Sequence, residues 1–133
     1  MPLAHDSNLT ERVIGFAIEV HRHLGPGLLE SAYEECLCSE LRRAEIDFRR
    51  QAPLPIVYKD VRLDCGYRLD LVVERRLVIE IKAVERLMPI DGAQLLTYLR
   101  LSGIKVGLLL NLNAVTLKQG LRRLVSGESS NTP

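Results

Sequence analysis

Three charged residues in two neighbouring hydrophobic segments could do chemistry together. The segment "LVIEIKA", residues 77–83, is apolar apart from Glu80 and Lys82. Side chains alternate along a β-strand, so these two charges point to the same face. Asp70, in the preceding segment "YRLDLVVE", supplies a second carboxylate. Core packing gives no reason for a charged cluster on a buried strand, so these residues are candidates for function.

Asp70 and Glu80 meet only if the two segments pair in a suitable antiparallel register. Directly opposite side chains of an antiparallel pair lie on the same face. A hairpin centred on Arg75 sets Asp70 opposite Glu80, whereas one centred on Arg76 sets Asp70 opposite Lys82. A two-residue turn would place the two acids on opposite faces. A functional pair therefore requires an odd-numbered loop or a bulge.

Two carboxylates this close repel each other strongly unless a cation lies between them. Mg²⁺ or Mn²⁺ fits this position, because hard cations take carboxylate oxygens as ligands. Lys82 could then hold or deprotonate a water molecule and stabilise charge on a phosphate. The alternative is a salt bridge at the strand end, in which Lys82 neutralises Asp70 or Glu80. The spacing alone leaves both readings open.

Helices are predicted on either side of these strands. Apolar residues recur with helical periodicity over residues 9–24, and "GPG" at 25–27 ends that helix. A second helix follows and ends near residues 44–45. A third runs over 91–102 and stops at Gly103, a residue suited to a helix C-terminus.

The predicted strands contain β-branched and aromatic residues separated by turn residues. Strict alternation puts Leu69, Leu71 and Val73 on one face of their strand and Asp70 on the other. Residues 116–125 are predicted as a short helix or an irregular segment. The order of elements predicts a single α/β domain around a mixed sheet. The predicted strands are residues 47–51, 55–59, 61–64, 67–74, 77–83 and 105–111.

Length and composition indicate one domain, predicted over residues 9–125, with flexible tails at 1–8 and 126–133. The net charge of +1 supplies no basic tail for bulk phosphate affinity. Three cysteines without a CxxC pair argue against a disulfide framework or a zinc site and for a reducing, cytoplasmic setting. No signal peptide or membrane span is evident, so no membrane partner is expected.

The spacing D-x9-E-x-K, from Asp70 to Lys82, resembles the active-site motif of the PD-(D/E)XK nuclease superfamily. Upstream, "GLLESAY" at 27–33 resembles the signature that gives the GxxExxY family its name. The segments "AIEVHRHLGPGLLESAYEECL", "QAPLPIVYKDVRL", "IEIKAVERL" and "AQLLTYLRLSGIKVGLLLNL" are similar to that family as well. The resemblance covers about residues 9–125.

The resemblance implies a restriction-endonuclease-like core with a mixed β-sheet flanked by helices, here with two N-terminal helices. It implies that Asp70 and Glu80 ligate Mg²⁺ or Mn²⁺, joined by the backbone carbonyl of Ile81. Glu30 resembles the extra acid that many of these nucleases project toward the metal. Lys82 would be the catalytic lysine.

Other positions have two readings each. Gln94 and Tyr98 resemble the QxxxY motif of the RecB-like branch, and their spacing places them on one helix face. They could contact nucleic acid or brace Lys82. Tyr33 is either a substrate-binding residue or a core residue whose hydroxyl bonds to a neighbour. His21 has a site role or is a satisfied core histidine.

One position departs from the family pattern. Asp91 stands about where a His is expected, and an Asp there would repel phosphate. The leading expectation is a nuclease that acts on DNA or RNA, with selectivity from nucleic-acid structure, a homodimer or a partner. The alternatives are a non-catalytic adaptor that binds nucleic acid or a protein, and a purely structural salt-bridged domain.

Overall fold

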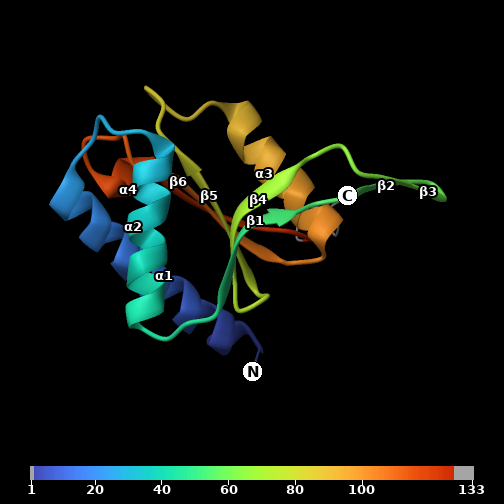
Figure 1. Cartoon of the computed structure of the whole chain (residues 1–133), viewed down its shortest axis with the longest axis horizontal. Helices are drawn as coiled ribbons and strands as arrows, with labels where there is room; N and C mark the ends of the chain where they lie inside the picture. Colours follow the sequence, from blue (N-terminus) through green and yellow to red (C-terminus); the bar gives the residue numbers. More distant parts are fainter. Residues whose placement is uncertain (1, 128–133) are drawn as a thin grey trace.

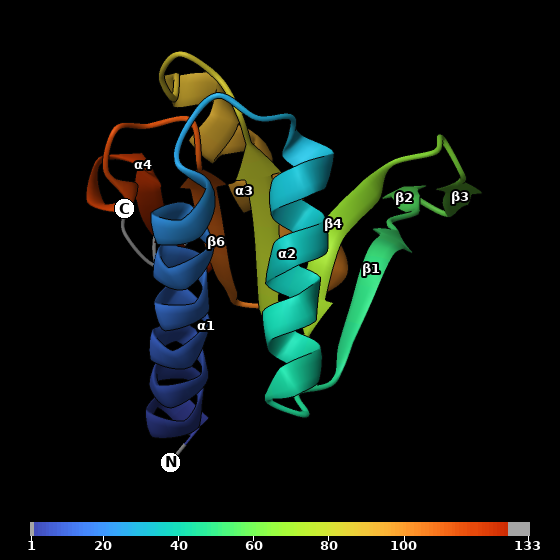
Figure 2. The same cartoon turned by 60° about the vertical axis from the view of Figure 1, so that its left-hand side comes forward.

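The computed structural model describes residues 2–127 and shows a sheet covered by helices on both faces (Figures 1 and 2). Helices α1 and α2 pack on one face, and α3 packs on the other. The elements in chain order are α1 (Pro2–Leu24), α2 (Glu30–Arg43), β1 (Phe48–Pro53), β2 (Ile56–Tyr58), β3 (Val61–Leu63), β4 (Arg68–Val73), β5 (Leu77–Lys82), α3 (Pro89–Ser102), β6 (Val106–Asn111), α4 (Leu117–Gly120) and β7 (Leu121–Val125).

The main sheet has the order β1-β4-β5-β6-β7, and only the β5–β6 pair is parallel. A parallel pair needs a crossover connection, which α3 provides between β5 and β6. The other neighbours pair antiparallel, so the sheet is mixed, as the sequence predicted. The central strands β5 and β6 are covered on both faces, which explains why their residues are almost uniformly apolar.

Two hydrophobic clusters lie on opposite faces of the sheet. The first joins α1 and α2 to β4, β5 and β6 through buried residues such as Leu37, Ile79 and Leu108. The second joins α3 to the opposite face and includes Leu95 and Val78. The candidate site residues Asp70 and Glu80 lie just beyond the Leu71–Ile79 pair, where the β4–β5 pairing ends.

The chain ends differ from the prediction. Helix α1 begins at Pro2, within the segment expected to be a flexible tail, and the expected tail over 128–133 lies outside the described residues. Residues 121–125 form a strand, β7, which pairs antiparallel with β6, and not a helical or irregular segment. The sequence "LRRLV" lacks a clear alternation because this edge strand is only partly buried.

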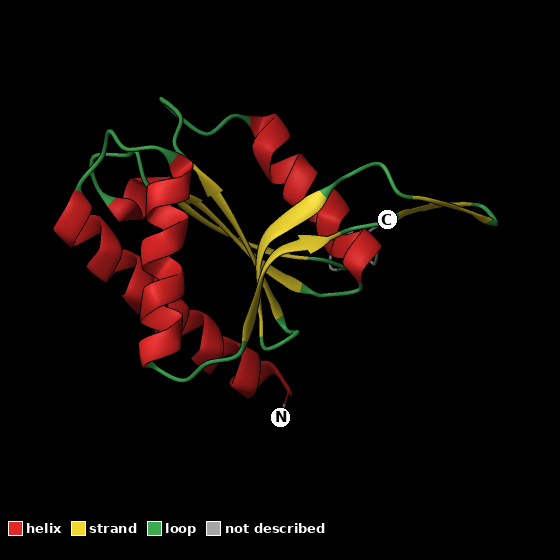
Figure 3. Cartoon of the chain, viewed as in Figure 1, coloured by secondary structure: helices red, strands yellow, loops and turns green. Residues whose placement is uncertain are grey.

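The β2–β3 hairpin stands away from the sheet, as Figure 3 shows. Its turn is at Lys59 and Asp60. Within residues 2–127, every helix is too short or too polar to cross a bilayer.

Candidate functional site

The β4–β5 hairpin has the register that brings the two acids together. Leu71 pairs with Ile79 and Val73 pairs with Leu77, so the hairpin is centred on Arg75. Its loop consists of the three residues 74–76, and Glu74 and Arg75 have φ values of 53° and 58°. Of the two registers considered from the sequence, the structure has the one with this odd-numbered loop. It sets residues 70 and 80 opposite each other across the two strands.

Beyond the Leu71–Ile79 pair, backbone N–H groups of the two strands donate to the two carboxylates and not to backbone carbonyls of the opposite strand. The Asp70 N–H donates to Oε2 of Glu80 at 2.9 Å. The Ile81 N–H donates to Oδ2 of Asp70 at 2.8 Å. Each acid therefore accepts a backbone hydrogen bond from the opposite strand, and this fixes both side chains at the point where the strands separate.

Strand β4 does not keep one strict alternation through this point. Leu71 and Val73 belong to the cluster under α1 and α2, whereas Leu69 belongs to the cluster under α3. The prediction that all three share a face was wrong. The change of face accompanies a kink in the neighbouring strand, where Gln51, opposite Asp70 in the β1–β4 register, has a φ of 53°.

Burial and mutual repulsion dominate the electrostatics of the acid pair. Glu80 is only 6% exposed, and its burial, together with the charge on Asp70, raises its pKa from 4.5 to about 8. Burial also raises the pKa of Asp70, against the lowering effect of the Ile81 N–H. The charge of Lys82 lowers the pKa of Glu80, but by less than burial and the charge of Asp70 raise it. This incomplete compensation is a condition that favours a bound cation.

Lys82 lies on the α3 side of this pair. Its Nζ donates to Oε1 of Gln94 at 3.4 Å and lies 4.0 Å from Oδ1 of Asp91. Asp91 also accepts the Met88 N–H at 2.8 Å, which caps the first turn of α3. The acid that stands in place of the expected His is therefore a helix-capping residue within reach of the lysine.

Tyr98 of α3 is affected by the charges of the acid pair. Its ring meets the ring of Tyr67 edge to face, with 6.3 Å between centroids. Burial raises the pKa of Tyr98, and the charges on Glu80 and Asp70 add to that rise. Gln94 and Tyr98 thus lie near the predicted site, while their contact with nucleic acid stays a prediction.

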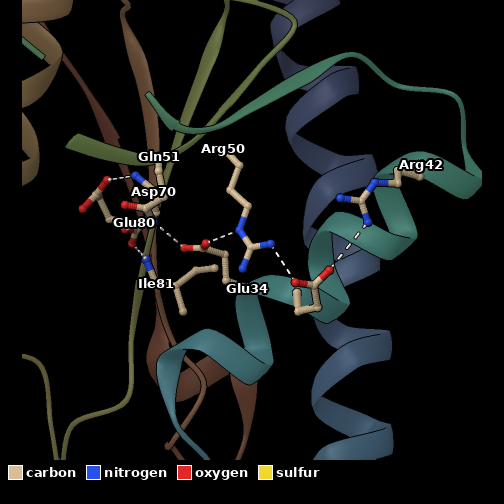
Figure 4. A network of polar contacts seen from close by, with 8 residues as sticks. Glu34, Arg42, Arg50, Gln51, Asp70, Glu80 and Ile81 are labelled. Carbon is tan, nitrogen blue, oxygen red and sulfur yellow. Dashed lines mark hydrogen bonds and ion pairs between the residues drawn. The ribbon is translucent and has the colours of Figure 1, made fainter. Parts of the chain in front are cut away.

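The structure adds a carboxylate that sequence reasoning missed, Glu34 of α2. It is 7% exposed. Its Oε1 accepts from Nε2 of Gln51 at 2.9 Å, and its Oε2 accepts from Nε of Arg50 at 2.5 Å (Figure 4). Its charge adds to the effect of burial in raising the pKa of Asp70. The available signal was its spacing of four residues from Glu30, which places both on one helix face.

Glu30 itself is exposed at the first position of α2. Its charge contributes to the raised pKa of Asp70, after burial and the charge of Glu34. In the described part of the chain, no three His, Cys, Asp or Glu residues lie together so that they could hold a metal ion. The predicted trio of Glu30, Asp70 and Glu80 therefore does not form such a group in this conformation.

Tyr33 and His21 have contacts of the kind expected for packing. Tyr33 is fully buried, donates to the Gly25 carbonyl at 2.6 Å and accepts the Leu28 N–H at 3.1 Å. These two hydrogen bonds hold the loop between α1 and α2 in place. Nε2 of His21 lies 2.8 Å from the carbonyl oxygen of Ala114, in the loop after β6. The structure thus favours the core reading at both positions.

Comparison with known protein families gives a match over nearly the whole chain. Residues 7–124 match the model of the PD-(D/E)XK nuclease superfamily. Neither the curated proteins nor the solved structures gave a match. The matched region includes the acid pair, Lys82 and the sheet that positions them. The chain therefore belongs to the PD-(D/E)XK nuclease superfamily.

Proposed function

We propose that this protein is a Mg²⁺- or Mn²⁺-dependent nuclease that hydrolyses phosphodiester bonds of DNA or RNA. The main support is the pairing of Asp70 and Glu80 across the separating strands, with Lys82 two residues further along β5. Membership of a nuclease superfamily agrees with this chemistry. The resemblance to the GxxExxY family adds to the proposal on the residues of "GLLESAY".

The residues at the site fit a hard divalent cation. The donors are carboxylate oxygens, which Mg²⁺ and Mn²⁺ prefer. The raised pKa of Glu80 shows that the pair holds two negative charges only at a cost, which a cation would offset. Asp70, Glu80 and the Ile81 carbonyl would hold the ion, with Glu30 as the predicted additional acid. Bound there, it would supply Lewis-acid polarisation of the scissile phosphate.

The other residues of the site have roles that follow from their positions. Lys82 would orient the attacking water and stabilise negative charge on the phosphate, since it is the cation beside the acid pair. Gln94 would hold the Lys82 ammonium through the contact between Nζ and Oε1. Tyr98 and Tyr67 would border the nucleic acid with their partly exposed rings.

The test is cleavage of labelled single- and double-stranded DNA and RNA with Mg²⁺, Mn²⁺ or EDTA. Lys82→Ala and Glu80→Ala proteins, purified identically, serve as controls for contamination. Metal-dependent cleavage that both substitutions abolish would support the nuclease and identify its substrate. Cleavage that persists in both variants would come from a contaminant, and no cleavage by any protein would count against the proposal.

A non-catalytic adaptor that binds nucleic acid or a protein is the second candidate. Asp91 favours it, because its carboxylate lies 4.0 Å from Lys82 and opposes the approach of a phosphate to that ammonium. The adaptor predicts binding of labelled nucleic acid or a protein without cleavage. Asp91→Asn would then strengthen binding to nucleic acid and leave the chain inactive, whereas a nuclease would gain activity from the same change.

A further inference from the structure

We propose that Gln51 is a positioning residue that sets the orientation of Asp70 by linking it to helix α2. This inference rests on the proposed function in one respect, namely that the orientation of Asp70 matters for metal binding. The link itself is a feature of the metal-free protein. It consists of one amide between two carboxylates, with its Nε2 2.9 Å from Oε1 of Glu34 and 3.4 Å from Oδ1 of Asp70.

The backbone places Gln51 for this contact. The β1–β4 ladder pairs Arg50 with Leu71 and Ala52 with Leu69, so Gln51 and Asp70 stand opposite each other between two paired positions. Gln51 has a φ of 53°, a conformation that costs a residue with a side chain about 1 kcal/mol or more. This kink lets both Arg50 and Gln51 reach Glu34 on α2, although consecutive residues of a regular strand point to opposite faces.

Glu34 gives the link a fixed anchor. The carboxylate is largely buried and accepts from Arg50 with one oxygen and from Gln51 with the other (Figure 4). Arg50 in turn donates to Glu35 at 2.7 Å, so the guanidinium is held between two acids. Because Glu34 is itself held by Arg50, its hydrogen bond to Gln51 keeps the Gln51 amide, and with it Nε2, in a fixed position.

The contact divides the two oxygens of Asp70 between different partners. Oδ1 accepts from Gln51, and Oδ2 accepts from the Ile81 N–H at 2.8 Å. A carboxylate held at both oxygens cannot rotate about its Cβ–Cγ bond without losing one contact. The Ile81 N–H thus becomes a probe of the Asp70 orientation that needs no metal.

The experiment is amide hydrogen exchange followed by NMR on the metal-free protein, with Gln51→Met as the test variant. Methionine keeps the length of the side chain and removes the amide. We expect exchange at the Ile81 N–H to speed up about threefold to tenfold, the effect of one hydrogen bond. Exchange at the Leu108 N–H, in the middle of β6, reports any loss of global stability, and we expect the acceleration at Ile81 to exceed the acceleration at Leu108.

Two neighbouring acids of α2 provide matched controls, since both bind Arg50 but only Glu34 binds Gln51. Glu34→Ala should speed exchange at Ile81, whereas Glu35→Gln should not. Glu34→Gln leaves one acceptor oxygen for the two donors Arg50 and Gln51, so it should also speed exchange at Ile81.

Mn²⁺ affinity, measured by electron paramagnetic resonance of the free ion, separates this inference from the proposed function. Gln51→Met should weaken Mn²⁺ binding about tenfold, as changes to residues that orient metal ligands do. A wild-type protein that binds no Mn²⁺ would contradict the metal site, and exchange at Ile81 would still decide whether Gln51 holds Asp70. Unchanged exchange at Ile81 in Gln51→Met, or equal acceleration at Ile81 and Leu108, would overturn the positioning role.

Discussion

The two sides of the acid pair are built differently. On the α2 side, Glu34 accepts two hydrogen bonds of 2.5 and 2.9 Å from consecutive residues of β1. On the α3 side, the Lys82 ammonium makes longer contacts, 3.4 Å to Gln94 and 4.0 Å to Asp91. Glu34 has a side chain only 9% exposed, whereas the side chain of Lys82 is 22% exposed.

This difference predicts different roles for the two sides. Contacts on the α2 side stabilise the site, and contacts on the α3 side serve its activity. Short contacts hold the buried Glu34 on the α2 side, and Gln51 links it to Asp70 through a longer contact of 3.4 Å. Removing a partner of Glu34 should cost stability. Long contacts to partly exposed groups leave Lys82 able to exchange its partners for a phosphate or a water. Changes on the α3 side should therefore affect activity more than stability, and changes on the α2 side should affect stability directly.

The largest expected effect tests the α3 side through activity. Lys82→Ala should lower the rate of metal-dependent cleavage about 10²–10³-fold, because it removes the cation that stabilises developing charge. Its free energy of unfolding should change by less than about 1 kcal/mol, since its ion pair is long and partly exposed. The control variant Lys105→Ala changes a lysine at the opposite end of the β5–β6 strand pair. It should cleave nucleic acid like the wild type. Equal losses in both variants would remove the special role of Lys82.

The next largest expected effect is a pH dependence of stability caused by Glu80, which lies between the two sides. Its pKa in the folded protein is about 8 against 4.5 for the free side chain. Between these values the folded protein keeps a proton that the unfolded chain has released, so a rise in pH favours unfolding. The metal-free protein should lose about 2–4 kcal/mol of stability from pH 4.5 to pH 8, and Glu80→Gln should flatten this slope.

Urea denaturation at a series of pH values measures this dependence. Added Mn²⁺ should restore stability near pH 8 in the wild type, because a ligand that binds only the folded state stabilises it. The same addition should have little effect on Glu80→Gln. A wild-type stability that does not fall over this pH range would show that Glu80 is compensated in a way the present contacts do not include.

A smaller effect is expected on the α2 side. Glu34→Ala should lower the free energy of unfolding by about 1–3 kcal/mol, because it removes a buried acceptor shared by Arg50 and Gln51. Glu35→Ala, which removes an exposed partner of the same arginine, should cost much less stability than Glu34→Ala. Chemical denaturation of both variants decides the comparison, and equal costs would mean that burial of Glu34 adds nothing.

The smallest effect on stability should come from Gln94 on the α3 side. Gln94→Ala should cost less than about 0.5 kcal/mol, since it removes one long hydrogen bond from a partly exposed residue. Thermal denaturation measures the loss. A cost as large as that of Glu34→Ala would erase the contrast between the two sides of the site.

Much of the site could be predicted because strands impose simple rules. Alternation along β5 put Glu80 and Lys82 together, and the parity of the hairpin loop limited how Asp70 could meet them. Glu34 could not be found in this way, since its role depends on Gln51 and Arg50 reaching across to α2 from a kinked strand. Strand β7 was missed because an edge strand with one partner has a weak apolar pattern.

The sequence by itself determined the family, the order of most elements and the acid pair with its lysine, because these depend on spacing along single segments. Only the tertiary structure decided the hairpin register, the change of face between Leu69 and Leu71, and the link from Glu34 through Gln51 to Asp70. Those features arise from contacts between elements far apart in the chain, whose geometry depends on packing that no local pattern encodes.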